Sequence, residues 1–268
     1  MICSSIKTIN DCLKELEPKS IMLMGNSYGY GLTEVTLQTV AATAKTGSKV
    51  VYFIQGYRIE KTRKMFEEIY HVNNIDNIIL EGKGTEDDGY SYFSTDEIEE
   101  RLKNIKDYDL VVIDDIRDFI DSETNEATYS LLFTKLSKVI DKFNVPFICT
   151  INCINYVSNS NIEEEKRDVE DMYEMAKDYV SFILYIGQKE PSEINIKVLD
   201  CRIKETNEDY LYDPSKSELY LIEGKLKDLY NKALSLGLSK PDARDYALYW
   251  ENKKEFKEDE NIELSIMN

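Results

Sequence analysis

The stretch IMLMGNSYGYGLTE, residues 21–34, joins an apolar run to a glycine-rich loop and the start of a helix. Ile21–Met24 has the length and composition of a buried strand. From Thr33 to Thr46 apolar residues recur at helical spacing, and Gly47 is a typical helix stop. A strand, a glycine-rich loop and a helix in this order form the frame of a phosphate-binding loop, in which backbone N–H groups and the helix N-terminus hold an anion.

The side chains that normally complete such a loop are missing. A phosphate-binding loop carries a lysine that reaches the β- and γ-phosphates and a Ser or Thr that holds magnesium. Here Gly31-Leu32-Thr33 stands in place of Gly-Lys-Ser/Thr, and Glu34 adds a negative charge to the first helical turn. With Gly31 as the second motif glycine, Asn26 stands where the first should be; with Gly25 as the first, the loop has one residue too many. On these residues alone, a plain glycine-rich turn is the simpler interpretation.

An acidic strand end later in the chain favours the phosphate-binding interpretation. Leu110–Ile113 is fully apolar and is followed by Asp114. An aspartate in this position orients magnesium in P-loop enzymes, although an acid often ends a buried strand for other reasons. One strand–helix unit and a further helix separate it from the glycine loop, which is the order expected of such an enzyme. We therefore expect Thr33 and Asp114 to hold Mg²⁺ weakly, if any metal binds.

Strands alternate with helices along most of the chain. Apolar and β-branched runs predict strands at 49–54, 77–80, 110–113, 147–151, 182–186 and 194–199, with a hairpin around Asp213-Pro214. Helices are expected over 59–69, after a capping box at Ser94–Glu97, over 129–143, and twice after Glu223. Runs that are hydrophobic on both faces predict a mostly parallel sheet covered by helices on both sides.

Five further segments occur in an order shared with a known family. They are Lys49–Gln55, Ile98–Asp115, Phe143–Asn152, Asp178–Ile186 and Ile194–Arg202. Together with the glycine loop they resemble the RecA superfamily, particularly the helicase domain of DnaB and its KaiC- and RadA-like relatives. The resemblance spans about 21–222 and implies a three-layer α/β RecA-like P-loop NTPase fold with a mostly parallel central sheet. Another three-layer α/β fold is the alternative.

The resemblance also implies domain limits and site residues. We expect the RecA-like domain to cover 1–222, a two-helix C-terminal appendage 223–258, and a disordered tail 259–268. The nucleotide-binding residues that it implies, all vestigial, are Gly25, Asn26, Gly29, Gly31, Leu32, Thr33, Asp114 and Asn152, the last at the position of the family's polar sensor. Gln55-Gly56 replaces the family's catalytic glutamate, so no catalytic residue is assigned and efficient turnover is not expected. No cofactor is required, and weak binding of ATP and Mg²⁺ stays open.

The composition argues against several classes of function. Thirty-three basic and 51 acidic residues give a net charge of −18, which repels nucleic-acid phosphates. The loops that the resemblance would place on DNA, 116–125 and 152–168, are acidic as well, so no direct nucleic-acid contact is expected. A single histidine, His71, argues against histidine catalysis and multi-histidine metal sites. Five cysteines without CxxC spacing and no apolar run near 18 residues predict a soluble cytoplasmic protein without disulfides or membrane segments.

Three hypotheses for the function follow. We favour a catalytically inactive RecA- or DnaB-like paralogue that regulates or assembles with a replication or recombination ATPase. A divergent ATP-binding ATPase that takes its missing lysine from elsewhere is one alternative, and an adaptor that shares only the fold is another. The expected partner is a RecA-type ATPase or helicase, or further copies of this chain.

Two sets of residues are expected at interfaces. Arg202 stands where the resemblance places an arginine that acts across a subunit interface. Tyr246, Tyr249 and Trp250 of the appendage either anchor a partner or pack the appendage onto the main domain, because aromatic residues at helical spacing serve both purposes.

Overall fold

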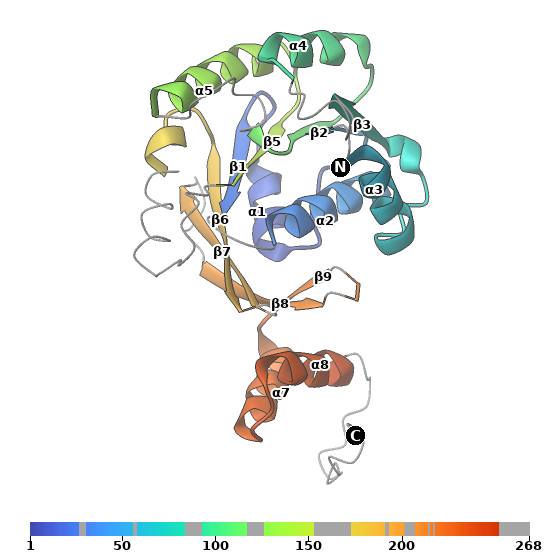
Figure 1. Cartoon of the computed structure of the whole chain (residues 1–268), viewed down its shortest axis with the longest axis vertical. Coiled ribbons are helices and arrows are strands. Elements are labelled where there is room, and N and C mark those ends of the chain that lie inside the picture. Colours follow the sequence, from blue (N-terminus) through green and yellow to red (C-terminus); the bar gives the residue numbers. More distant parts are fainter. Residues whose placement is uncertain are drawn as a thin grey trace. The chain divides into compact units, whose positions relative to one another are not determined.

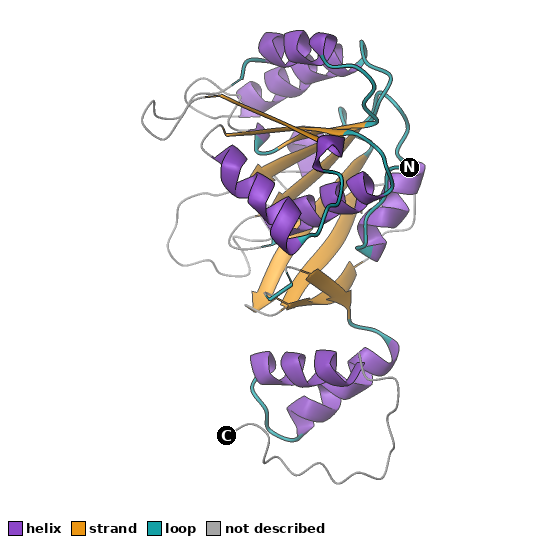
Figure 2. Cartoon of the chain, turned by 90° about the vertical axis from the view of Figure 1, so that its right-hand side faces the viewer, coloured by secondary structure: helices purple, strands orange, loops and turns teal. Residues whose placement is uncertain are grey.

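The computed structural model describes residues 1–26, 31–55, 58–83, 93–116, 126–152, 173–190, 193–200, 207–213, 215–216 and 218–251. The chain divides into two compact units, Met1–Leu221 and Ile222–Asn268. The described part of the first unit is a sheet with helices on both of its faces (Figures 1 and 2), and that of the second unit is a pair of helices.

The sheet of the first unit has nine described strands in the order β3-β2-β4-β5-β1-β6-β7-β8-β9. Their bounds are β1 (Ile21–Asn26), β2 (Val50–Gln55), β3 (Ile78–Lys83), β4 (Leu110–Ile113), β5 (Phe147–Asn152), β6 (Phe182–Glu190), β7 (Glu193–Asp200), β8 (Asn207–Asp213) and β9 (Glu218–Leu221). Neighbours are parallel from β3 through to β6, and β7, β8 and β9 extend the sheet in antiparallel fashion. The predicted mostly parallel sheet and the hairpin around residue 213 are confirmed.

Helices cover the two faces of this sheet. Their bounds are α1 (Lys7–Glu15), α2 (Leu32–Lys45), α3 (Ile59–Lys64), α4 (Thr95–Asn104) and α5 (Glu126–Ile140), and α3 continues into a π-helical turn at Met65–Ile69. The predicted capping box starts α4: the Glu97 amide donates to Ser94 Oγ at 3.2 Å, and the Ser94 amide donates to Glu97 Oε2 at 2.8 Å. This local prediction is confirmed, because its two partners are only three residues apart.

The alternation of side chains along the strands gives the unit two apolar cores. Met22 and Met24 of β1 belong to the core that contains the buried faces of α1 and α2. Ile21 and Leu23 of the same strand belong to the core that contains those of α4 and α5. A sheet that is apolar on both faces needs a helical layer on each, and this produces the three layers.

The N-terminal helix α1 was not predicted. Its residues Ile9, Cys12 and Leu13 are buried at helical spacing against the sheet. The segment before it is fastened to α2 by polar contacts: Thr43 Oγ1 donates to the Cys3 carbonyl at 2.7 Å, and the hydroxyls of Ser4 and Thr39 lie 3.0 Å apart. The first twenty residues therefore belong to the layer that carries the glycine-loop helix.

The second unit consists of α7 (Gly224–Ser235) and α8 (Lys240–Glu251). The predicted apolar face of α7 is buried, and Ala243, Ala247 and Leu248 are the buried residues of α8. Tyr246 and Trp250 are half-buried, whereas Tyr249 is 55% exposed. The Trp250 ring lies 6.4 Å from that of Tyr246 and 5.3 Å from that of Tyr249, so the three form an aromatic cluster that is partly open to solvent.

Of the helices that the structure describes, none combines the length and the apolarity needed to cross a membrane.

Candidate functional site

A pocket of about 280 Å³ lies at the ends of the central parallel strands. It is lined by Asn26 of β1 and Asn152 of β5, by Gly31, Leu32, Thr33, Glu34 and Leu37 around the start of α2, and by Arg58, Lys61, Thr62 and Met65 of the α3 segment. Strands β1 and β5 pair in a register that sets Asn26 beside Asn152. The chain places β2 to β5 on one side of β1 and β6 on the other. Such a switch point, at the carboxyl ends of the strands, is where open α/β sheets bind ligands.

The entry to α2 is fixed by a glycine and a carboxylate. Gly31 has a φ of 119°, and a Cβ built there would lie 3.1 Å from Ile194 Cδ1, so both the backbone and the space require glycine. The Gly31 amide donates to Glu34 Oε2 at 2.9 Å. In a phosphate-binding loop, amides at this helix N-terminus face the phosphates. Here the protein's own carboxylate occupies one of these donors.

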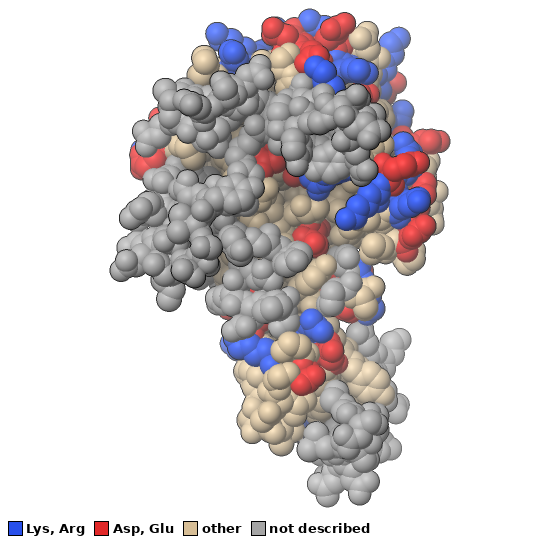
Figure 3. Space-filling model, in the orientation of Figure 1, with Lys and Arg blue, Asp and Glu red and all other residues tan. Residues whose placement is uncertain are grey.

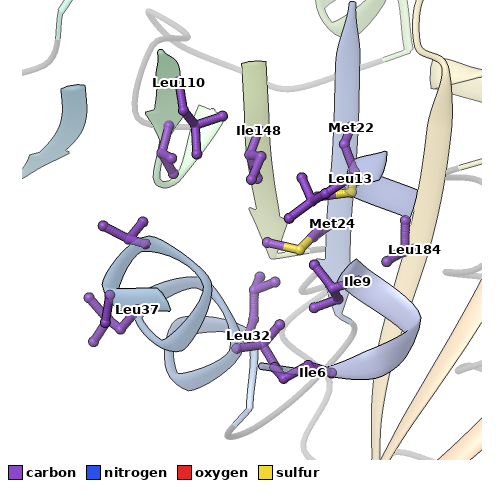
Figure 4. Packing of buried hydrophobic residues seen from close by; sticks show 14 of the residues in the cluster. Ile6, Ile9, Leu13, Met22, Met24, Leu32, Leu37, Leu110, Ile148 and Leu184 are labelled. Atoms are coloured by element: carbon purple, nitrogen blue, oxygen red, sulfur yellow. The ribbon is translucent and has the colours of Figure 1, made fainter. Parts of the chain in front are cut away.

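Leu32 packs into the core rather than offering a charge to a ligand. Its side chain is only 3% exposed. Figure 4 shows it beside Ile6 and Ile9 at the start of α1, in the space between α2 and the sheet. Thr33, the next residue, is half-buried and lines the pocket.

Asp114 lies just beyond the end of β4, and two hydroxyls engage its carboxylate. Tyr52 donates its hydroxyl to Oδ2 at 2.6 Å, and Thr150 donates to Oδ1 at 2.6 Å. Arg58 Nη2 lies 3.7 Å from Oδ2. Burial and the adjacent Asp114 carboxylate raise the pKa of Tyr52 well above its ordinary value. A magnesium ion held by Thr33 and Asp114 would have to displace at least one of these hydroxyls, because both carboxylate oxygens already accept a hydrogen bond.

Asp115 holds the residue at the sensor position. The backbone amide of Asn152 donates to Asp115 Oδ2 at 2.9 Å, and its side-chain Nδ2 donates to the same oxygen at 2.8 Å. The amide side chain of Asn152 is thereby oriented at the pocket wall by a carboxylate from the neighbouring strand end.

Two cationic side chains of the pocket were missed by the sequence analysis. Arg58 immediately precedes α3, and Lys61 lies three residues further on. Residues at this spacing share a helix face. The sequence analysis used the spacing of Ile59, Thr62 and Phe66 only to find the buried face of the helix. The same spacing places Arg58 and Lys61 together, but the fold was needed to show that they face the start of α2.

The predicted site residues are only partly brought together. Asn26, Gly31, Leu32, Thr33 and Asn152 line the pocket. Gly25 lies inside β1, paired with Ile151 and Tyr185. Gly29, Arg202 and the side chain of Gln55 lie outside the described residues. Among the residues that are described, no three His, Cys, Asp or Glu side chains are grouped closely enough to hold a metal ion.

Comparison with known proteins shows the fold. No protein-family model matches the chain, and no curated protein sequence matches it. A DnaB-like replicative helicase, described with its interactions with primase, superposes with a TM-score of 0.58 at 10% identity. That match covers 81% of this chain and 62% of the helicase, so the chain spans less than two thirds of the helicase's length.

Two further solved structures are similar over most of their own length. One, an ATPase domain solved on its own, has a TM-score of 0.57 at 11% identity, and the match covers 83% of this chain and 92% of that domain. The flagellar accessory protein FlaH from Methanocaldococcus jannaschii has a TM-score of 0.58 at 12% identity, with 83% and 98% covered. Similarity at this level of identity carries the fold alone. The fold of this chain is therefore RecA-like, as the order of its motifs predicted.

Proposed function

We propose that this chain is a RecA-fold subunit that does not turn over nucleotide and that regulates or assembles with a replication or recombination ATPase in the cytoplasm. The observation that carries the proposal is the hydrogen bond from the Gly31 amide to the Glu34 carboxylate. It places a negative charge where a RecA-type ATPase would place a phosphate. Leu32, buried beside it, supplies no charge that could offset this repulsion.

Hydrolysis needs positioned charge that the described residues around this loop offer poorly. Phosphoryl transfer depends on neutralising the charge of the transferred group and on orienting the attacking water. Loss of one electrostatic contributor commonly lowers the rate by about 10²-fold or more. The loop has no lysine, and Gln55 replaces the glutamate of the resembled family. Two such losses leave little catalysis.

The direct test is ATP hydrolysis by the purified chain with Mg²⁺. The expected rate is that of a buffer control. A turnover near 1 s⁻¹, at the low end for ordinary enzymes, contradicts the proposal if Thr33→Val abolishes it, because that loss assigns the activity to this pocket. A rate that Thr33→Val leaves unchanged belongs to a contaminating ATPase.

A divergent ATPase is the second candidate function, and one observation favours it. Arg58 and Lys61 bring positive charge to the pocket from α3 instead of from the loop. If these cations replaced the loop lysine, hydrolysis would depend on them. Turnover that Lys61→Ala abolishes and that Lys64→Ala, on the same helix, leaves intact would establish this alternative.

The aromatic cluster of α8 is the proposed partner surface. Tyr249 is 55% exposed and stacks edge-on against Trp250, and solvent-accessible aromatic residues are the usual anchors of protein interfaces. The similar helicase structure, described with its interactions with primase, is what directs the search towards replication proteins. Affinity capture with the full chain should recover an ATPase of this class, or further copies of the chain.

A matched pair of variants tests this surface. Tyr249→Ala should lose the captured protein, whereas Leu236→Ala should retain it, because Leu236 is equally exposed in the same unit but lies outside the cluster. Equal capture by both variants would show that the cluster is not the anchor. Light scattering of the wild type over a concentration series separates self-association from capture of a different protein.

A further inference from the structure

The pocket carries more positive charge than its glycine loop predicts. Its described lining contains two cations, Arg58 and Lys61, and one carboxylate, that of Glu34. The local balance is thus positive in a chain whose net charge is −18. Charge beyond about 8 Å is largely screened at physiological salt, so the groups that line the pocket determine which ions it attracts.

The two cations differ in how the fold holds them. Arg58 is 27% exposed, and its Nη2 lies 3.7 Å from the buried carboxylate of Asp114, which fixes its position. Lys61 is exposed, and no carboxylate in the part of the chain that the structure describes forms an ion pair with it. Most other lysine ion pairs of the unit are formed on the surface with Asp or Glu, as for Lys83 with Glu97 and Lys142 with Glu99. Lys61 instead has its charge available at the pocket.

We propose that this pocket binds a phosphoryl group through Arg58 and Lys61 of the α3 segment, with the Glu34 carboxylate competing for the Gly31 amide. This inference rests on the proposed function in one respect only, namely that the site is the same. An arginine fork, a lysine and the half-buried hydroxyl of Thr33 are the donors that phosphate oxygens accept. Binding requires the phosphate to take the position of the Glu34 carboxylate at the helix N-terminus, or to lie beside it on the α3 side.

The competition with Glu34 makes the affinity adjustable. Gln at position 34 can still accept the hydrogen bond from the Gly31 amide, but it removes the negative charge that faces an incoming phosphate. Glu34→Gln should therefore strengthen binding, whereas loss of either cation should weaken it. A purely structural role for these side chains predicts no such opposite effects.

The test is calorimetric titration of the full chain with inorganic tripolyphosphate, without added metal. We expect a Kd of about 0.1–1 mM. One exposed charge contributes up to about 1 kcal/mol, or about fivefold. Lys61→Ala should therefore weaken binding about fivefold, and Glu34→Gln should strengthen it by a similar factor. Arg58→Lys keeps a charge beside Asp114, so that the variant folds, and should weaken binding because the planar fork is lost.

Lys64→Ala is the control, since Lys64 is exposed on the same helix and does not line the pocket. It should bind like the wild type. Absence of tripolyphosphate binding, or equal weakening by Lys61→Ala and Lys64→Ala, overturns the inference. ATP and adenosine distinguish the sources of the phosphoryl group. Binding of ATP with the same dependence on Lys61 supports it, whereas binding of adenosine and not of tripolyphosphate overturns it.

The outcome for the proposed function is separate. If tripolyphosphate fails to bind while ATP is not hydrolysed, this inference fails and the proposed function stands. If ATP binds through Lys61 and is hydrolysed, the inference stands and the inactive-subunit proposal fails.

Discussion

The side chain of Leu32 is part of the apolar core, and this limits what one substitution can restore. Leu32→Lys places an ammonium where the wild type has a side chain only 3% exposed, among Ile6 and Ile9. Burial of a charge without a partner is costly. We expect Leu32→Lys to lower the free energy of unfolding by about 2–4 kcal/mol in urea denaturation, and not to confer ATP hydrolysis.

The matched control is Leu32→Met, which conserves volume and polarity and should cost less than about 1.5 kcal/mol. If Leu32→Lys proves as stable as Leu32→Met and gains turnover, then the lysine reaches the pocket, and the loop differs from a working one only in that residue.

The hydroxyl of Tyr52 links stability to high pH. Its hydrogen bond to Asp114 and its burial raise the pKa of Tyr52 in the folded state. The ordinary pKa of tyrosine is about 10, so the unfolded chain loses this proton first as the pH rises. The stability that Tyr52 contributes is therefore complete below about pH 10 and is lost progressively above it. Tyr52→Phe should be about 1–2 kcal/mol less stable than wild type at neutral pH, and this difference should shrink above about pH 10.

Thr150→Val is the control for this pH dependence. It removes the other hydroxyl from Asp114 but no group that titrates in this range. The difference in unfolding free energy between wild type and Thr150→Val should stay constant from about pH 8 to pH 11. A constant difference for Tyr52→Phe as well would show that its pKa is not raised.

At the residue scale the sequence revealed what the loop lacks, but not what the pocket contains. Leu32 and Glu34 stand at positions whose function is defined by the motif, so their departure from it is legible without a structure. Arg58 and Lys61 belong to no motif. Helical spacing shows that they share a face, whereas the direction in which that face points depends on how the π-helical turn and β2 place the helix.

At the element scale, α1 is held to the sheet by one carboxylate. Glu208 of β8 accepts hydrogen bonds from Lys7 Nζ at 3.0 Å, from the hydroxyl of Tyr210 at 2.9 Å and from that of Thr8. Burial opposes the charge of Glu208, but these three donors outweigh it and hold its pKa below the ordinary value. A lowered pKa means that the contribution is present at neutral pH and is lost as the pH falls below about 4.3.

Glu208→Gln should accordingly reduce the free energy of unfolding by about 1–3 kcal/mol at neutral pH, and the loss should disappear in acid. Hydrogen exchange should show the amides of α1 opening more often. Lys7→Ala, which removes only a half-exposed partner, should cost no more than about 1 kcal/mol. Equal effects of both variants at neutral pH would mean that the ion pair, and not the hydroxyl bonds, holds the helix.

This contact also explains why α1 was missed. Lys7–Glu15 is only nine residues long, and a helix of that length is marginal without tertiary contacts. Its stabilising partners lie about two hundred residues away in sequence, on a strand whose place in the sheet no local pattern gives. The capping box of α4 was predictable for the opposite reason, since both of its hydrogen bonds join residues three positions apart.

At the scale of the whole molecule, the distribution of charge predicts that the isolated chain does not bind DNA. Lys and Arg side chains intermingle with Asp and Glu over the described surface seen in Figure 3, and no continuous basic stripe crosses it. Non-specific affinity for DNA comes mainly from neutralising phosphates and releasing counterions, and a net charge of −18 opposes both. The positive pocket holds only two cations beside a carboxylate, too few to follow a DNA backbone.

Fluorescence anisotropy with labelled single- and double-stranded oligonucleotides checks this prediction most stringently at about 50 mM salt, where electrostatic binding is strongest. No change in anisotropy is expected up to micromolar protein. Binding at micromolar concentration that weakens steeply with added salt would contradict it, because only a basic surface gives such a salt dependence. Lys61→Glu then decides where that surface lies: loss of binding in this variant would place the nucleic acid at the pocket, and unchanged binding would place it on residues outside the described part of the chain.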